Sequence, residues 1–220
     1  MLDLLSLSFD VFHGGSVSGA YVPIEDTSER GRANAMSEQQ SASEPLICTI
    51  GHSTHPLDEF VGILKANEVK HILDVRTVPR SRHNPQFNKE TLPGSLKVAG
   101  IKYTHLPGLG GLRHAHKDSI NGAWRNASFR GYADYMQTPE FASNVQDVME
   151  LAGKERCALM CAEAVPWRCH RSLIADALTV RGARVEDIIN TQGRKVHVIT
   201  PWAQTDGLRI FYPPQENLPL

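Results

Sequence analysis

Short apolar runs and amphipathic stretches alternate along the chain from residue 46 onward. Apolar runs rich in Ile, Val and Leu are typical of strands, and apolar residues repeated at i, i+3, i+4 and i+7 predict helices with one buried face. The predicted strands are residues 46–50, 71–76, 101–106, 157–161, 185–189 and 195–199, and the predicted helices are residues 57–64, 138–152 and 171–178, with a weak one around residues 92–99.

This alternation predicts an α/β fold with three layers, a mostly parallel sheet with helices on both faces. All of the alternating elements lie within residues 45–200. A chain of 220 residues is long enough for one domain with a full core. We therefore expect a single α/β domain over residues 45–200.

The two ends of the chain have a different composition. Residues 27–44 are mostly Ser, Glu, Gln, Ala and Arg, which cannot bury enough apolar surface to offset the entropy of ordering. We therefore expect residues 1–44 to be a disordered extension, with Met36 as a possible alternative start. Residues 201–220 lack periodicity and predict an irregular tail.

Polar residues with chemical uses follow most of the predicted strands. Ligands bind parallel α/β sheets outside the carboxyl ends of the strands, so these side chains are expected to converge. Reading the strand ends in order gives His52, His55, Asp74, Arg76, His105, Cys161 and Glu163. The enrichment in His, Cys, Asp and Arg predicts a site at this edge of the sheet.

The strongest chemical signal lies in residues 157–178. An apolar run ends at Cys161, a loop follows, and a helix begins near His170. The N-terminus of a helix favours an anion or a thiolate through its backbone N–H groups and its dipole. We expect Cys161 to be the nucleophile and Glu163 to orient or accept a proton. His170, or else His52, would be the acid or base.

Basic residues gather between residues 76 and 130. This segment has ten Lys and Arg residues against two carboxylates, an excess of eight positive charges in a chain whose net charge is -1. Interleaved aromatic rings add faces on which bases can stack. We expect a phosphate-bearing partner, either a nucleotide-like small molecule or a nucleic acid. The residues expected to hold its anionic group are Arg76, Arg80, Arg82, Arg171 and Ser172.

The overall composition is that of a globular protein, with 41% hydrophobic and 21% charged residues. Four cysteines in a chain of this length fit a reducing cytosol better than a disulfide scaffold. No segment approaches the roughly 20 apolar residues needed to cross a bilayer. We therefore expect a cytoplasmic protein without a membrane partner, and no motif indicates a cofactor or an oligomeric state.

Two other functions remain open at this point. Cys161, Cys169 and His170 could bind a metal ion, although no Cys-x-x-Cys spacing supports a zinc site. Alternatively, the chain could be a non-catalytic nucleic-acid-binding module in repair or stress response, which would bind through residues such as Arg80 and Arg82. Whether the protein is an enzyme is therefore uncertain from sequence.

Four motifs resemble a bacterial family called domain of unknown function 488. The resemblance spans about residues 46–200 in the order of the family and implies the same domain, but no reaction. The motifs are Thr49-Ile-Gly-His-Ser-Thr, Leu73-Asp-Val-Arg with Pro79-Arg-Ser-Arg, Tyr103-x-His-Leu-Pro-x-Leu-Gly-Gly, and Cys161-x-Glu-x-x-Pro-x-x-Cys-His-Arg-Ser. The chain departs from the family pattern at Leu92-Pro-Gly-Ser-Leu, where we expect a shortened or shifted helix.

A weaker resemblance is to rhodanese-like and Cys-loop phosphatase domains. These also have Asp-x-Arg after an early strand and a Cys that opens an anion-binding loop before a helix. Phosphatases of that class have Arg six residues after the nucleophile, whereas Trp167 stands at that spacing from Cys161 and Arg168 comes one residue later. The resemblance therefore implies architecture rather than phosphatase activity.

Overall fold

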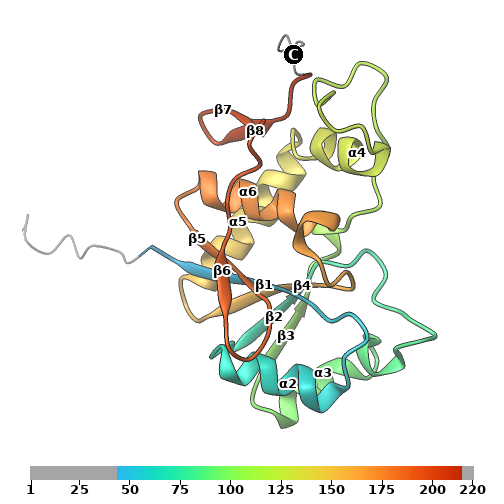
Figure 1. The fold of residues 1–220 in the computed structure, drawn as a ribbon, viewed down its shortest axis with the longest axis vertical. Helices are drawn as coiled ribbons and strands as arrows, with labels where there is room; N and C mark the ends of the chain where they lie inside the picture. The colour runs from blue at the N-terminus through green and yellow to red at the C-terminus, as the bar shows by residue number, and fades with distance from the viewer. Residues whose placement is uncertain (1–43, 215–220) are drawn as a thin grey trace, which may run out of the picture. The chain divides into compact units, whose positions relative to one another are not determined.

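The computed structural model describes residues 44–214 (Figure 1). The predicted extension over residues 1–44 and the possible start at Met36 lie outside the described residues, apart from residue 44 itself. They therefore stay predictions.

A six-stranded sheet in the order β3-β2-β4-β1-β5-β6 lies at the centre of the described chain (Figure 1). Its first five strands run parallel, and β6 at the edge is antiparallel to β5. The strands are β1 (Leu46–Gly51), β2 (His71–Asp74), β3 (Lys102–His105), β4 (Cys157–Cys161), β5 (Arg184–Ile188) and β6 (Arg194–Val196).

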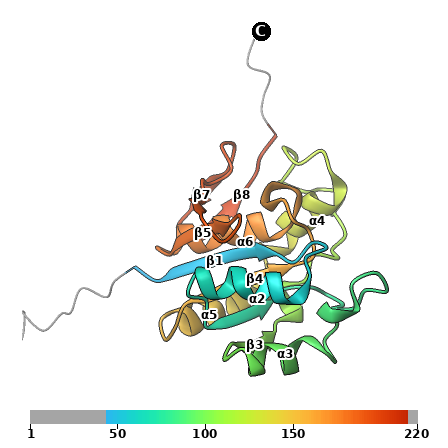
Figure 2. The ribbon, with the colours of Figure 1, turned by 60° about the horizontal axis from the view of Figure 1, so that its bottom comes forward.

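Helices cover both faces of this sheet (Figures 1 and 2). On one face lie α2 (Leu57–Ala66) and α3 (Leu92–Val98), whose apolar residues form one core cluster with the strands. A second cluster, on the other face, contains residues of α4 (Ala127–Tyr135), α5 (Pro139–Ala152) and α6 (Arg171–Val180). The predicted three-layer α/β fold is confirmed.

Strand side chains alternate between the two cores, as the pleat of a strand requires. In β4, Ala158 and Met160 belong to the cluster with α2 and α3, which we call the α2/α3 core. Cys157, Leu159 and Cys161 belong to the cluster with α4, α5 and α6, which we call the α5/α6 core. The strand is therefore apolar at every position, which explains its continuous hydrophobic run. The same alternation places the thiol of Cys161 on the α5/α6 side of the sheet.

The chain leaves the neighbouring strands β1 and β4 toward opposite faces of the sheet. After β1 it continues into α2, and after β4 it continues into α6. Connections that diverge in this way open a crevice at the strand ends, where ligands bind in open α/β sheets. The register pairs Gly51 of β1 with Cys161 of β4, so the two residues meet at this crevice.

The segment after residue 200 is more regular than the sequence predicts. The prediction of an irregular tail is wrong for residues 204–211, which form a hairpin of β7 (Gln204–Asp206) and β8 (Arg209–Phe211). Gly207 adopts a φ of 58° in its turn. Ile210 and Tyr212 are buried in the α5/α6 core. Because two apolar residues anchor the whole segment, no periodicity reveals it.

His197 ties the chain after β6 to the core through two carboxylates. Its Nε2 lies 2.7 Å from Asp176 Oδ1, its Nδ1 lies 3.9 Å from Asp187 Oδ2, and its side chain is 8% exposed. The Tyr212 hydroxyl donates to the other oxygen of Asp176 at 2.8 Å. Burial alone would lower the pKa of His197, but the hydrogen bonds and charges of the two carboxylates outweigh it and raise the pKa to about 9.

Replacing His197 with Gln should therefore remove a pH-dependent part of the stability. A histidine pKa raised above its unfolded value stabilises the fold fully below about pH 6.5, and this contribution is lost as pH rises through about 9. We expect the difference in unfolding free energy between wild type and His197→Gln to shrink over this range by on the order of 3 kcal/mol. Urea denaturation at several pH values measures this difference in unfolding free energy. Because the thiols titrate in both proteins, their contribution cancels when the two free energies are subtracted.

The matched control for this prediction is His83→Gln, which changes an exposed histidine. Because an exposed side chain loses no buried contact, this change should alter the unfolding free energy by less than about 0.5 kcal/mol. A pH-independent difference for His197→Gln would contradict the assignment of a protonated His197.

Across residues 44–214, no helix combines the length and the apolar character that a bilayer crossing requires.

Candidate functional site

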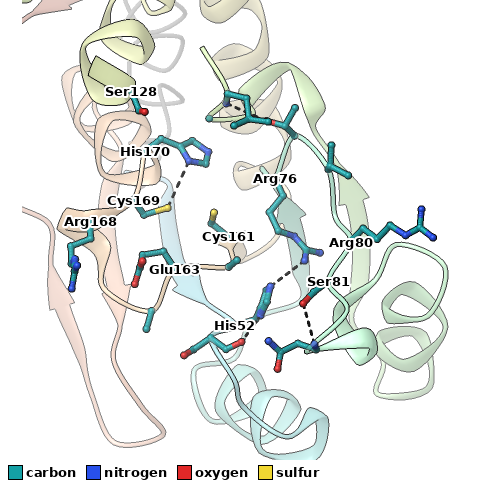
Figure 3. A pocket seen from close by; sticks show the side chains of 18 of the residues that line it. His52, Arg76, Arg80, Ser81, Ser128, Cys161, Glu163, Arg168, Cys169 and His170 are labelled. Atoms are coloured by element: carbon teal, nitrogen blue, oxygen red, sulfur yellow. Dashed lines mark hydrogen bonds between the residues drawn. The ribbon is translucent and has the colours of Figure 1, made fainter. Parts of the chain in front are cut away.

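A cavity opens at the carboxyl ends of β1, β2 and β4 (Figure 3). Its volume is about 770 Å³, which is within the range of natural small-molecule sites. The residues that line it are His52, Ser53, Thr54, Arg76, Thr77, Val78, Arg80, Ser81, Asn84, Gly111, Leu112, Ser128, Phe129, Cys161, Ala162, Glu163, Ala164, Arg168, Cys169 and His170. The cavity thus combines thiols, histidines and arginines from segments far apart in the sequence.

The loop after Cys161 is held against the end of β1 by backbone contacts. The backbone N–H of His52 donates to the carbonyl of Cys161 at 2.9 Å, and the N–H of Ser53 donates to the carbonyl of Ala162 at 3.0 Å. A Cβ atom on Gly51 would lie 1.9 Å from the carbonyl oxygen of Glu163. This position therefore requires glycine because the loop lies directly on the backbone there.

Two thiols and an imidazole meet in this cavity. The Sγ atoms of Cys161 and Cys169 and a ring nitrogen of His170 all lie within 4.8 Å of one another. Figure 3 shows Cys161 between Cys169 and His170 on one side and Arg76 and His52 on the other. Both cysteines are free thiols. Such a grouping can store a proton and present a thiolate to a ligand.

The surroundings favour a thiolate on Cys161. The neighbouring Cys169 thiol opposes the effect of burial and lowers the pKa of Cys161 far below its ordinary value, and His170 and the backbone of Glu163 lower it further. The closeness of Cys161, together with burial, raises the pKa of Cys169. The opposite directions of the two shifts favour the thiolate on Cys161 over the thiolate on Cys169.

The orientation of His170 leaves its Nδ1 facing the thiols. Its Nε2 lies 3.1 Å from the carbonyl oxygen of Val75, which can only accept, so Nε2 carries a hydrogen. Nδ1 lies 3.8 Å from the Sγ of Cys169. The ring packs on Tyr132 at 5.0 Å between centroids, and a Cβ atom on Gly111 would come within 2.5 Å of Nδ1. The ring of His170 is therefore held with Nδ1 toward the thiols.

Arg76 is held rigidly at the opposite side. Its Nε and Nη2 donate to the carboxylate of Asp74 at 2.9 and 2.6 Å, Nη2 also donates to the carbonyl of Phe87 at 2.8 Å, and Nη1 donates to Nε2 of His52 at 3.1 Å. A guanidinium has five N–H donors, so these contacts leave one Nη1–H for a ligand. Arg76 is therefore a pre-oriented donor whose charge Asp74 largely balances.

Both ring nitrogens of His52 have hydrogen-bond partners within the chain. Its Nδ1 lies 2.9 Å from the carbonyl oxygen of Ser53, so Nδ1 carries the hydrogen and Nε2 accepts from Arg76. The ring stacks on Phe87 with centroids 4.2 Å apart. Burial lowers the pKa of His52, and the charge of Arg76 lowers it further. A neutral His52 with both nitrogens occupied does not fit the predicted alternative role of acid or base.

The sequence profile of a family described as Domain of unknown function DUF488 matches residues 56–178, which is more than half of the chain. The chain belongs to the DUF488 family. This confirms the resemblance read from the sequence motifs. No curated protein and no solved structure matches this sequence. The matched region of the DUF488 domain includes the two thiols, His170 and Arg76, while His52 precedes it.

Arg171 and Ser172 of the DUF488 domain lie beneath the loop and not in the cavity. Arg171 is 1% exposed. Its guanidinium donates to the carbonyls of Glu163 and Ala164 at 2.5 and 3.0 Å and to Thr49 Oγ1 at 3.2 Å. The Ser172 hydroxyl donates to the carbonyl of Cys169 at 3.0 Å. The prediction that these two residues bind the anion does not fit this placement, because the chain itself occupies their donors.

Two arginines reach the cavity with exposed side chains. Arg80 and Arg168 both line it, and Figure 3 shows them on opposite sides. Arg82, predicted with Arg80 to bind an anion, is exposed but does not line the cavity. The two lining arginines can attract an anion, and Arg82 can only add to the long-range potential.

Of three further residues predicted at the strand ends, two support Arg76 from outside the cavity and the third lies away from it. Asp74 is fully buried and orients Arg76. His105 donates from Nε2 to the carbonyl of Arg76 at 2.8 Å. His55 faces Glu59, with 3.0 Å between Nδ1 and Oε1, and does not line the cavity. Of the residues predicted to converge at the strand ends, the cavity is thus lined by His52, Arg76, Cys161 and Glu163.

Several lining residues are absent from the sequence-based prediction. Ser128 and Phe129 come from α4, which lies in a stretch where the sequence predicts neither a helix nor a strand. The signal for this helix is Asn126, whose side chain accepts from both of their backbone N–H groups as an N-cap. Arg168 follows Pro166 in a short 3₁₀ helix (Pro166–Arg168), and no spacing rule points to it.

The thiol grouping also fits part of a metal site. Cys161, Cys169 and His170 offer three donor atoms, and within residues 44–214 no fourth His, Cys, Asp or Glu belongs to the group. Glu163, predicted to orient or accept a proton, lines the cavity but stays outside this group. A structural zinc site usually has four protein ligands, whereas a catalytic one keeps an open position.

Proposed function

We propose that this DUF488 domain is a thiol-dependent enzyme whose Cys161 attacks a small, phosphate-bearing substrate. The observation that carries the proposal is the grouping of the Cys161 thiol with Cys169 and His170, whose donor atoms lie within 4.8 Å of one another, in a cavity of about 770 Å³. A buried thiol with no function normally has a raised pKa, as Cys48 and Cys157 do, at about 11 and about 12.

The proposed step is a nucleophilic displacement at the substrate. The thiolate of Cys161 supplies the electron pair of the new bond, and the leaving group departs with the electron pair of the broken bond. The Cys169 thiol, whose Sγ lies 3.8 Å from His170 Nδ1, holds a proton that can pass to the leaving group. His170 is suited to relay this proton because the carbonyl of Val75 fixes its ring.

The cavity wall supports an anionic substrate. Arg76 offers one N–H, and Arg80 and Arg168 add two exposed positive charges on opposite sides. Ser81 and Asn84 line the wall next to Arg80 and can donate to phosphate oxygens. A cavity of this size suits a nucleotide-sized ligand. Binding of a nucleic-acid strand and of a metal ion are the alternatives that the sequence left open.

The test compares alkylation of Cys161 at different pH values with the neutral reagent iodoacetamide. We expect Cys161 to react at pH 6 almost as fast as at pH 8.5, because its lowered pKa keeps it a thiolate. An ordinary thiol would slow on the order of 100-fold over this range. Peptide mass mapping identifies the labelled residue, and Cys48 and Cys157 are internal controls. A Cys161 that reacts no faster than Cys48 at pH 6 would contradict the proposal.

A second arm of the same experiment tests the anion preference. Iodoacetate differs from iodoacetamide by its carboxylate, so the ratio of the two rates at Cys161, relative to free N-acetylcysteine, reports attraction of an anion. We expect this ratio to exceed that of N-acetylcysteine about tenfold and to fall in the double variant Arg80→Gln, Arg168→Gln. Inorganic phosphate should slow the labelling. The variant Arg82→Gln, outside the cavity, is the matched control and should keep the wild-type ratio.

A further inference from the structure

The cavity holds a second thiol that a simple displacement does not require. Cys169 is 4% exposed, lines the cavity beside Cys161, and is a free thiol. The Sγ atoms of the two cysteines are at most 4.8 Å apart. A disulfide has an S–S length of about 2 Å, so the two atoms need to approach by less than about 3 Å. Rotation of the two cysteine side chains can supply this approach, together with a movement of the loop of residues 162–170. Residues 162–164 of this loop are exposed.

We infer that Cys169 is the resolving thiol of Cys161 and that the substrate is an anionic low-molecular-weight disulfide. The inference rests on the proposed function, because Cys161 must first act as nucleophile toward an anionic ligand. It adds the chemical class of the substrate and a catalytic residue for the second step.

The two steps balance as thiol–disulfide exchange. Cys161 thiolate attacks one sulfur of the substrate R–S–S–R, forming Cys161–S–S–R and releasing RS⁻. Cys169, after losing its proton, attacks the Sγ of Cys161, forming the Cys161–Cys169 disulfide and releasing the second RS⁻. The substrate gains two electrons and the two cysteines lose them. The proton of Cys169 passes through His170 Nδ1, 3.8 Å away, to a released RS⁻, which leaves as RSH. An external dithiol must then reduce the internal disulfide.

Electrostatics order these steps. While Cys161 is a thiolate, its closeness and its charge are major causes of the raised pKa of Cys169, together with burial. Formation of Cys161–S–S–R removes that charge. The positive charge of Arg171 and its backbone N–H, which lower the pKa of Cys169, are then opposed by burial alone. Cys169 thus becomes a better nucleophile once the first step is complete.

Cys48 and Cys157 cannot act as the nucleophile or as the resolving thiol. Cys48 is fully buried and belongs to the α2/α3 core. Cys157 is fully buried at the opposite end of β4 from Cys161. Neither lines the cavity. Cys161 and Cys169 are therefore the cysteines that a cavity-bound disulfide can reach.

The test uses the reduced full-length chain and three disulfides with different groups around the same bond. Glutathione disulfide carries carboxylates, coenzyme A disulfide carries phosphates, and hydroxyethyl disulfide is neutral. Released thiol is counted per chain, and the cysteines that remain free are counted by alkylation and located by peptide mapping. The proteins are wild type, Cys169→Ser, Cys161→Ser and Cys157→Ser, the last being the same change outside the cavity.

For wild type and Cys157→Ser we expect two thiols released per chain and a disulfide between Cys161 and Cys169. For Cys169→Ser we expect one thiol released and a stable R–S adduct on Cys161. For Cys161→Ser we expect no release. The anionic disulfides should react about tenfold faster than the neutral one. A faster reaction of coenzyme A disulfide would identify phosphate as the recognised group, and a faster reaction of glutathione disulfide would identify carboxylate.

Two results would overturn the resolving role: release of two thiols by Cys169→Ser, or a stable adduct on wild type. Equal rates with the neutral disulfide would overturn the anionic substrate. If no disulfide reacts although Cys161 is alkylated rapidly at pH 6, the inference fails and the proposed nucleophile stands. If Cys161 is not alkylated rapidly either, both fail. Stoichiometric zinc that blocks both thiols would also overturn the inference.

Discussion

Asp74→Asn should destabilise the domain by about 3–5 kcal/mol, because it leaves the buried guanidinium of Arg76 without its counter-charge. Asp74 is fully buried and accepts from three donors of Arg76, at 2.9 Å from Nε, 2.6 Å from Nη2 and 3.1 Å from the backbone N. It also accepts from the hydroxyl of Tyr103 at 2.7 Å. An amide in its place carries no charge and turns two N–H donors toward these donors. Urea denaturation at pH 7 measures the loss.

The double variant Asp74→Asn, Arg76→Met separates charge from shape. If the unpaired charge causes the loss, removing Arg76 in the same chain should restore part of the stability. Asp118→Asn is the matched control, since Asp118 is exposed, and it should change the unfolding free energy by less than about 0.5 kcal/mol. If Asp74→Asn also lowers the unfolding free energy by less than about 0.5 kcal/mol, the ion pair of Asp74 and Arg76 does not stabilise the domain.

Arg171→Met should cost about 3 kcal/mol or more of stability and slow the alkylation of Cys161. The guanidinium of Arg171 joins Thr49 Oγ1 to the carbonyls of Glu163 and Ala164, and hydrogen bonds to a charged group contribute about 1.5–3 kcal/mol each. Without it, the two carbonyls lose their donor and the loop that presents Cys161 is no longer held. Urea denaturation and the iodoacetamide rate at pH 6 measure the two effects.

Arg171→Lys tests the geometry of this contact. A single ammonium cannot reproduce the fixed fork of a guanidinium, so we expect an intermediate loss. Arg82→Met changes an exposed arginine outside the cavity and should leave both readings unchanged. Wild-type stability together with a wild-type alkylation rate in Arg171→Met would mean that Arg171 does not hold the loop.

The role of Arg171 depends on a buried chain of polar contacts that no linear pattern displays. Thr49 donates to Asp187 at 2.6 Å, and Asp187 faces His197, which pairs with Asp176. These residues lie on two strands, the chain after β6 and a helix. Their contacts connect the loop after Cys161 to the C-terminal part of the domain. The sequence predicts that Arg171 binds an anion because it stands at a helix N-terminus. In the structure its side chain is buried and points to Thr49 and the loop carbonyls instead of the cavity.

Much of the fold is predictable because strongly apolar segments leave little choice. The run ending at Cys161 was predicted as residues 157–161, and β4 has the same bounds. The helix that begins at the Thr138-Pro139 cap corresponds to α5 (Pro139–Ala152). By contrast, α4 has a weakly apolar sequence, and its N-cap is its main signal. The hairpin of β7 and β8 depends on two buried residues, so tertiary packing stabilises it rather than local preference.

The sequence by itself determined the α/β class, the thiol at the end of a strand and the membership of the DUF488 family. These features rest on local periodicity and on motifs whose members are close in sequence. Only the tertiary structure decided that His170 faces the thiols while His52 faces Arg76, and that Arg171 faces inward while Arg168 lines the cavity. The reason is physical: strand order and burial fix where side chains point, and both arise from contacts between residues far apart along the chain.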